Sequence, residues 1–279
     1  MSSMRHGFCV GALLFCALAR TVSAEPTLTV AAGGRTAIYT AAGLLALPGA
    51  TTVTVPNDVA YKRTMTFRAV PMATLLAGTA TDDNVRFLAG DGFKATLPAA
   101  ALLARGGGAM AYLAVETADA PWPALKTGEP ATAGPFYMVW LHPERVALAR
   151  EQWPYQIVRI DTVAPPAKRY PMITPAASVP ANHPIRAGFA AFQKFCMACH
   201  TLNGGGEATA GPDLNIPYNP TEYLRPEALR RVIRDPQALH RWPESKMPAF
   251  DSKTLPDREL AELVAYLRHM ADRKVAPPK

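Results

Sequence analysis

Cys196-Met197-Ala198-Cys199-His200 is the stretch of sequence that decides how the C-terminal part of this chain folds. Two cysteines separated by two residues could form a disulfide, and the same spacing occurs in thioredoxin-type redox sites. The histidine that follows distinguishes this stretch from both, because Cys-x-x-Cys-His is the attachment signature of c-type haem. The thiols form thioethers with the haem, and the imidazole binds iron. Residues three and four apart share one helix face, so all three side chains can address one planar macrocycle.

The other two cysteines lie near the N-terminus, in a segment with the pattern of an export signal. Arg5 precedes an apolar stretch over residues 7–19, and Val22-Ser23-Ala24 supplies the small residues typical of a cleavage site. The stretch is shorter than the roughly 20 apolar residues of a membrane-spanning helix, although an uncleaved anchor is the alternative. Removal of residues 1–24 as a signal peptide leaves the motif pair as the only thiols. The prediction is a protein exported to the periplasm, with no membrane segment beyond the signal.

The composition is that of a globular protein and argues against nucleic-acid binding. The 279 residues are 49% hydrophobic and 18% charged, which excludes a disordered chain. The formal charge of +7 is spread along the sequence, whereas a nucleic-acid binder is expected to concentrate its basic residues in a dense run or on one face. We therefore expect no nucleic-acid partner.

Apolar periodicity predicts helices on both sides of the Cys-x-x-Cys-His motif. The first helix begins at residues 182–184 and continues to the motif, and two more are predicted at residues 225–234 and 257–270. Gly188 interrupts the first helix. Because a glycine inside a helix costs about 1 kcal/mol relative to alanine, we expect a packing reason for it.

Together, the motif and these helices resemble a class I cytochrome c domain over residues 182–273. In that family the first and last helices cross closely at a glycine and an aromatic residue, and the resemblance places these at Gly188 and Tyr266. It implies an all-α cytochrome c domain over residues 183–279, with one haem c bound covalently by the two cysteines of the motif.

The same resemblance implies the axial ligands of the haem iron. Met247 is followed by a proline and resembles the distal methionine of the family, so His200 and Met247 are the expected pair. His240 and His269 are the alternative sixth ligands. Methionine with histidine raises the reduction potential relative to two histidines, because the soft thioether favours ferrous iron.

A loop beyond the motif resembles the segment that orients the axial histidine in this family. Such a histidine usually donates its other ring proton to a fixed acceptor. In the family the acceptor is a proline carbonyl, and Gly211-Pro212-Asp213-Leu214 resembles that loop. Pro212 is therefore the expected acceptor of the ring proton of His200.

Residues 25–162 are predicted to form a second, mixed and mainly β domain. Short strand-like runs separated by turns occur at residues 28–30, 51–55, 64–68, 85–88, 112–116, 136–140 and 156–161. Short helices are predicted at residues 40–45 and 71–76. Residues 163–182 are predicted to be an extended, proline-rich linker, with prolines at Pro165, Pro166, Pro171, Pro175 and Pro180.

The order of these elements resembles the molybdopterin-binding domain of the sulfite oxidase superfamily. The match rests on residues 67–76, 85–93, 111–116 and 134–140. Enzymes of that superfamily bind molybdenum through a cysteine thiolate, yet no cysteine occurs between Glu25 and Phe195. Asp58 or His142 could take the place of the missing cysteine as a metal ligand, but a carboxylate or an imidazole would give a metal centre of different electronic character from a thiolate site. The predicted fold is thus α+β, a sulfite-oxidase-like domain free of molybdopterin followed by a cytochrome c domain.

Two functions are compatible with this combination. The first is an electron carrier that passes single electrons to a redox partner protein, with the N-terminal domain as a docking or binding module. Lys194, Arg241 and Lys246 are then expected to flank the haem edge that the partner uses. The alternative is a molybdopterin-type oxidoreductase that passes substrate electrons to its fused haem. The missing cysteine favours the carrier, and Met247 argues against catalysis at an open iron position. No catalytic residue is predicted.

Overall fold

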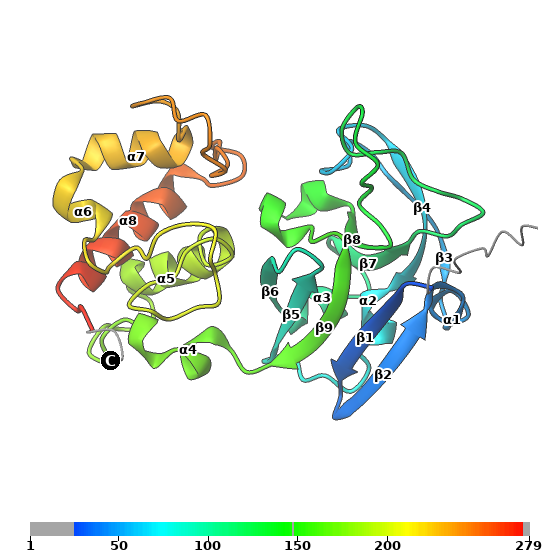
Figure 1. Cartoon of the computed structure of the whole chain (residues 1–279). Coiled ribbons are helices and arrows are strands. Elements are labelled where there is room, and N and C mark those ends of the chain that lie inside the picture. The colour runs from blue at the N-terminus through cyan, green and yellow to red at the C-terminus, as the bar shows by residue number, and fades with distance from the viewer. Residues whose placement is uncertain (1–24, 147, 276–279) are drawn as a thin grey trace, which may run out of the picture.

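A sheet part and a helical part follow one another along the chain (Figure 1). The computed structural model describes residues 25–146 and 148–275, so the predicted signal peptide lies outside the described residues. The strands are β1 (Thr27–Ala32), β2 (Arg35–Thr40), β3 (Thr51–Val55), β4 (Met65–Pro71), β5 (Asn84–Ala89), β6 (Lys94–Pro98), β7 (Met110–Val115), β8 (Phe136–Leu141) and β9 (Ile157–Val163). The helices are α1 (Ala41–Leu45), α2 (Met72–Leu75), α3 (Ala99–Leu103), η1 (Pro143–Arg145), η2 (Arg150–Gln152), α4 (Pro166–Arg169), η3 (Pro171–Ile173), α5 (Pro184–Phe195), α6 (Pro220–Tyr223), α7 (Pro226–Arg234) and α8 (Asp257–Ala271).

The sheet part, residues 27–163, contains two sheets packed around one core. Their strand orders are β2-β1-β9-β5-β6 and β3-β4-β7-β8. All neighbouring strands run antiparallel except β1 and β9, which are parallel. Strand β5 alternates between buried and half-buried residues, as a strand with one face on the core does. Strand β8 is buried at all positions from Phe136 to Trp140, so both of its faces are covered.

All seven strands expected from the sequence are present, and β2 and β6 are additional. Both are outer strands of the five-stranded sheet, with a single neighbour each. No residue of β2 is buried, and β6 buries only Ala95 and Leu97. Because an outer strand with few buried residues needs little apolar patterning, neither strand gave a signal in the sequence. Strands followed by helices confirm the predicted α+β fold class.

The helical part, residues 184–271, is organised around the crossing of α5 and α8. A Cβ atom on Gly188 would lie 1.9 Å from the carbonyl oxygen of Glu262 and 2.7 Å from the Cβ atom of Tyr266. The ring of Tyr266 is fully buried, with its centre 5.5 Å from that of Phe189 and 5.6 Å from that of Phe192. The close crossing expected at Gly188 is therefore confirmed.

The first helix begins at Pro184, within the residues 182–184 expected from the sequence. His183 is the N-cap of α5, since its Nδ1 accepts the backbone N–H of Ile185 at 3.2 Å, and Pro184 occupies the first helical position.

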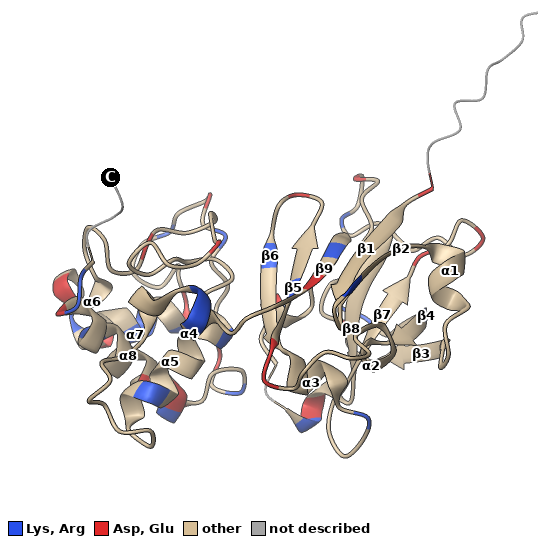
Figure 2. Cartoon of the chain, turned by 90° about the horizontal axis from the view of Figure 1, so that it is seen from below, with Lys and Arg blue, Asp and Glu red and all other residues tan. Residues whose placement is uncertain are grey.

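None of the helices in residues 25–146 and 148–275 is long and apolar enough to cross a membrane. Figure 2 shows basic and acidic residues on both parts of the chain, in keeping with the even spread of charge along the sequence.

The proline-rich residues 163–182 are not extended as predicted. They contain α4 and η3, in which prolines occupy the first helical positions, where the missing N–H costs nothing. Ile173 is fully buried against the helical part, and its carbonyl oxygen accepts the hydroxyl of Tyr266 at 2.6 Å. The backbone N–H of Ala176 donates to Nε2 of His269 at 3.1 Å. This segment is thus packed onto α8.

We expect Gly188→Ala to destabilise the helical part. The new Cβ would displace the backbone at Glu262, and overpacking of this kind costs about 1–3 kcal/mol. Gly43→Ala in α1 is the matched control, because a Cβ there meets only Oγ1 of Thr40, at 3.5 Å. Thermal unfolding measured by circular dichroism should show a melting temperature lowered by several degrees in the first variant only. Equal melting temperatures of the two variants would contradict the close crossing.

Candidate functional site

The Cys-x-x-Cys-His motif forms a turn that continues the end of α5. Cys196 is the C-cap of this helix, and its N–H donates to the carbonyl oxygen of Phe192 at 2.9 Å. The backbone N–H groups of Cys199 and His200 both donate to the carbonyl oxygen of Cys196, at 3.0 and 2.9 Å. This turn brings two free thiols and one imidazole into the same small region.

The two thiols lie close to a carboxyl group from the sheet part. Burial, together with the smaller effect of the negative charge of Glu151 in η2, raises the pKa of Cys196 to about 12. Burial and Glu151 also raise the pKa of Cys199. Both thiols are therefore protonated at neutral pH. This neighbour could not be predicted from the sequence, because η2 and the motif are far apart along the chain.

The structure brings His200 and Pro212 together. Nδ1 of the imidazole lies 2.8 Å from the Pro212 carbonyl oxygen, so in the tautomer protonated at Nδ1 it donates to this oxygen and Nε2 is left with a free lone pair. A Cβ atom on Gly211 would lie 2.5 Å from Cε1 of the imidazole and 2.7 Å from Nδ1. The ring therefore packs directly on the backbone of the loop, which a side chain at this position would prevent. Burial lowers the pKa of His200, so the ring is neutral at pH 7.

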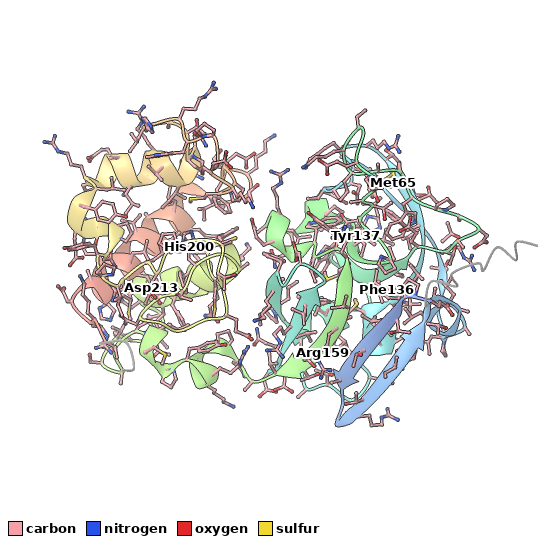
Figure 3. The ribbon with its side chains drawn as sticks, viewed as in Figure 1. Met65, Phe136, Tyr137, Arg159, His200 and Asp213 are labelled. Atoms are coloured by element: carbon pink, nitrogen blue, oxygen red, sulfur yellow. The ribbon has the colours of Figure 1, made fainter. Side chains whose placement is uncertain are left out.

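Asp213 anchors the loop that carries Pro212. Its Oδ2 accepts the hydroxyl of Thr201 at 2.8 Å and the N–H of Gly204 at 2.8 Å, and its Oδ1 accepts the N–H of Asn215 at 2.8 Å. Burial alone would raise the pKa of Asp213, but these donors outweigh it and hold the pKa below its ordinary value. Figure 3 shows Asp213 and His200 side by side in the helical part. The sequence suggested the loop but not this carboxylate.

A chain of buried asparagines connects the same loop to α8. Nδ2 of Asn215 donates to Oδ1 of Asn203 and to the carbonyl oxygen of Met270, both at 2.7 Å. Nδ2 of Asn219 donates to Oδ1 of Asn215 at 2.8 Å and to the carbonyl oxygen of Leu267 at 2.9 Å. All three asparagines are buried. Single asparagines in a loop carry no pattern, so sequence reasoning missed them.

Met247 lies in the segment between α7 and α8. Its side chain is half-buried and packs against the core of the helical part. The segment is held by α7: Nη1 of Arg234 donates to the carbonyl oxygens of Phe250 at 2.8 Å and Leu255 at 2.6 Å. The sixth-ligand assignment of Met247 stays a prediction.

The alternative sixth ligands have other surroundings. His240 is exposed, and its ring lies edge-on to Trp242 at 4.7 Å between centres. Trp242 is 51% exposed, so it does not fill the core. His269 lies on α8, where its Nε2 already accepts the N–H of Ala176. His269 would have to give up this hydrogen bond before Nε2 could bind a metal.

Lys194 differs from the other two basic side chains expected at the haem edge. It is half-buried, its Nζ lies 4.5 Å from the ring centre of Phe195, and it pairs with Glu259 at 3.9 Å. Burial lowers the pKa of Lys194. Arg241 and Lys246 are exposed. A residue that docks a partner protein at the haem edge should be a free charge on the surface, and Lys194 is not one.

The residues considered as substitute metal ligands in the sheet part are not in contact with one another. Asp58 is fully buried, and its carboxylate accepts the N–H groups of Ala60 and Tyr61, each at 2.9 Å, and the hydroxyl of Tyr137 at 3.0 Å. His142 is exposed and lies in the turn after β8. Both oxygens of the Asp58 carboxylate thus already have hydrogen-bond partners.

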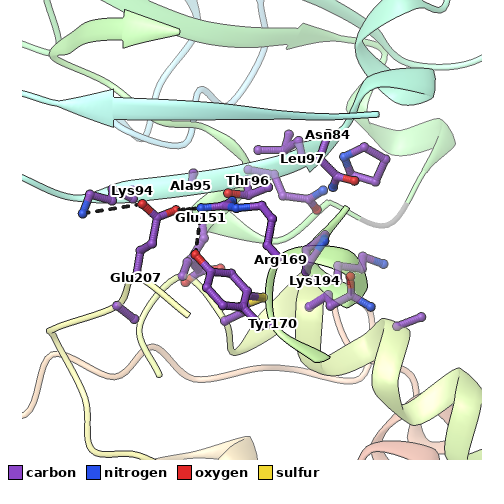
Figure 4. Close-up of a pocket in the computed structure, with 18 of the residues that line it drawn as sticks. Asn84, Lys94, Ala95, Thr96, Leu97, Glu151, Arg169, Tyr170, Lys194 and Glu207 are labelled. Carbon is purple, nitrogen blue, oxygen red and sulfur yellow. Dashed lines mark hydrogen bonds and ion pairs between the residues drawn. The ribbon is translucent and has the colours of Figure 1, made fainter. Parts of the chain in front are cut away.

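An ion-pair network joins the sheet part to the loop that follows the motif, and Figure 4 shows the contacts of Glu207 with Lys94 and Arg169. Arg86 on β5 donates to Glu207 at 2.7 Å and to Asp161 on β9 at 2.9 Å. Arg169 of α4 also donates to Glu207, and Nζ of Lys94 on β6 lies 3.8 Å from it. Burial alone would raise the pKa of Glu207, but Arg169 and Arg86 outweigh it and hold the pKa below its usual range. Glu207 thereby connects both parts.

Comparison with known proteins supports a cytochrome c domain in the C-terminal part. Residues 183–267 match the family model "Cytochrome C oxidase, cbb3-type, subunit III". This part of the chain is similar to a cytochrome c domain, a kind of domain that carries haem and transfers electrons. No curated protein matches the chain.

One solved structure that matches is the sulfane dehydrogenase SoxCD from Paracoccus pantotrophus, with 15% sequence identity and a TM-score of 0.34. The match covers 49% of this chain and 38% of that one. The match therefore spans less than half of either chain.

We expect Glu207→Gln to destabilise the protein at neutral pH and to have little effect in acid. Because its partners lower the folded-state pKa, the contribution of Glu207 is fully present above the unfolded value of about 4.5 and is lost as the pH falls through the folded value. Urea unfolding between pH 7 and pH 3 measures this difference. Glu129→Gln is the control, since Glu129 forms only an exposed pair with Lys126. A difference independent of pH would contradict the role of the network.

Proposed function

We propose that this protein is a single-electron carrier with one haem c, bound covalently by Cys196 and Cys199, with His200 and Met247 as axial ligands. The observation that carries the proposal is the contact between Nδ1 of His200 and the Pro212 carbonyl oxygen, beside both thiols and within the residues that match the cytochrome family model. When bound, the haem would supply a one-electron couple between ferric and ferrous iron.

The residues present fit this group. The turn after α5 supplies two thiols for thioethers, and the adjacent imidazole is neutral, with Nε2 free to bind a metal. Gly211 leaves room for the imidazole to pack on the loop, and Pro212 fixes its rotation. A half-buried methionine supplies a soft sulfur donor. Nitrogen from histidine with sulfur from methionine is a donor pair typical of cytochrome c iron.

The sheet part is proposed to be a docking or binding module rather than a catalytic domain. Support comes from the Glu207 network, which holds this part beside the loop that follows the haem motif. We further propose a location in the periplasm, as the signal pattern of residues 1–24 predicts, and a redox partner protein there. Arg241 and Lys246 are two exposed basic side chains that an acidic partner can contact.

We expect Met247→Ala to abolish the charge-transfer band between methionine sulfur and ferric iron and to lower the reduction potential, because the soft thioether favours ferrous iron. Optical spectra and a potentiometric titration measure the two effects. Met172→Ala is the control, since Met172 is an exposed methionine in η3. An unchanged spectrum in Met247→Ala would contradict the assignment and transfer the role to His240 or His269.

The alternative function, a molybdopterin-type oxidoreductase, differs in metal content. Because residues 25–195 contain no cysteine, we expect about one iron per chain, negligible molybdenum and no extractable pterin. The measurement is elemental analysis of protein purified from its native host with molybdenum supplied. Stoichiometric molybdenum would overturn the carrier proposal and favour an oxidoreductase with a built-in haem acceptor.

A further inference from the structure

A single side chain holds residues 206–210, which lie between the haem motif and the Pro212 carbonyl group. In the described part of the chain, the only hydrogen bonds of these residues are those of the Glu207 carboxylate. The segment leads directly to Gly211, whose N–H donates to the carbonyl oxygen of Cys199 at 2.7 Å. Because the His200 imidazole packs on the backbone of Gly211, the position of this segment affects the position of the ring.

Glu207 is bound by residues from outside the helical part. Nη1 of Arg86 on β5 donates to its Oε1 at 2.7 Å, and Nη2 of Arg169 in α4 donates to its Oε2. Each carboxylate oxygen therefore has a guanidinium partner. Figure 4 shows the second of these contacts, together with Lys94 on the other side of the carboxylate. Hydrogen bonds between two charged groups are stronger than neutral ones, so this clamp is the main restraint on the segment.

Arg86 is in turn fixed to the five-stranded sheet. It lies directly opposite Asp161 in the pairing of β5 with β9, and its Nη2 donates to Oδ2 of this carboxylate at 2.9 Å. Asp161 is buried and also accepts Nε of Arg159 at 2.7 Å. The side chains of Arg86 and Glu207 are only 26% and 22% exposed, so solvent and salt screen their pairing less than that of an exposed pair. One guanidinium thus connects the sheet to the loop.

The hydrogen bond of the imidazole is the property that this loop controls. Donation from Nδ1 to the Pro212 carbonyl oxygen raises the basicity of the His200 ring and fixes its orientation. A more basic ligand stabilises ferric iron and so lowers the reduction potential of a bound haem. Release of the loop would weaken this hydrogen bond, and the potential would rise.

We propose that Glu207 is a positioning residue through which the sheet part restrains the loop and thereby lowers the reduction potential of the haem. The inference rests on the proposed function, because it concerns a haem bound at the motif. It adds an effect of the sheet part on the haem itself, which docking of a partner does not require. Glu207 acts through the backbone of residues 206–211 and not by contact with the iron ligands.

Replacement of Arg86 separates the effect of position from that of charge. Loss of a positive charge alone favours ferric iron and lowers the potential, whereas release of the loop raises it. We therefore expect Arg86→Gln to raise the potential, measured by potentiometric titration of the full-length protein purified from its native host. The double variant Arg86→Gln with Glu207→Gln loses one charge of each sign and releases the loop, so it should also have a raised potential.

Arg68→Gln is the matched control, because Arg68 forms an exposed pair with Asp119 within the sheet part. Its potential should equal that of the wild type. Hydrogen exchange measured by mass spectrometry is a second readout that does not depend on charge at the haem. Exchange in residues 206–211 should be faster in Arg86→Gln and unchanged in Arg68→Gln. Arg169→Gln removes the other guanidinium partner, should show the same two effects, and takes the place of Arg86→Gln if that variant does not fold.

The outcomes distinguish failure of this inference from failure of the proposed function. A wild-type protein without covalent haem would overturn both. A haem whose potential falls in Arg86→Gln and is unchanged in the double variant would show that only charge acts, and this would overturn the inference alone. Unchanged exchange of residues 206–211 in both Arg86→Gln and Arg169→Gln would also overturn it, because the clamp would then not restrain the loop.

Discussion

The close contact of α5 with α8 at Gly188 is the constraint on which the candidate site depends. With no side chain at Gly188, the two helices approach until the backbone of α5 lies against the carbonyl group of Glu262 in α8, and this fixes the end of α5, where the haem motif begins. Helix α8 in turn positions the far side of the site. Near its end, the carbonyl oxygens of Met270 and Leu267 accept the side-chain amides of Asn215 and Asn219. Asp213 in turn accepts the backbone N–H of Asn215. The packing of α5 on α8 thus determines the positions of both the His200 imidazole and the Pro212 carbonyl group that accepts its proton.

The loop after the motif serves two contacts at once. At its end the Pro212 carbonyl orients His200, and in its middle Glu207 joins Arg86 and Arg169. The position of the sheet part is therefore coupled to the same short loop that orients the proposed iron ligand. This arrangement places Glu151 of the sheet part close to both thiols of the motif.

Local sequence patterns predicted most of the fold, and long-range contacts account for what they missed. The motif, the strands and α5, α7 and α8 depend on periodicity and neighbouring residues, which a single sequence contains. Glu151 reaches the thiols, and Arg86 reaches Glu207 across 121 positions, only after both parts have folded. The same reason explains Lys194, whose basic character suggested a surface role although its pairing with Glu259 and its burial follow from packing. The prolines of residues 163–182 suggested an extended linker, but apolar Ile173 draws this segment onto α8.

The central claim is a haem bound covalently by Cys196 and Cys199, and the intact mass of the denatured protein tests it most directly. Protein purified from its native host is measured by mass spectrometry after acid denaturation, beside the variant in which both cysteines are alanine. The account predicts a polypeptide that carries the mass of one haem, and a variant that carries none. A denatured wild-type chain with the mass of the polypeptide alone, and haem released into the solvent, would contradict it.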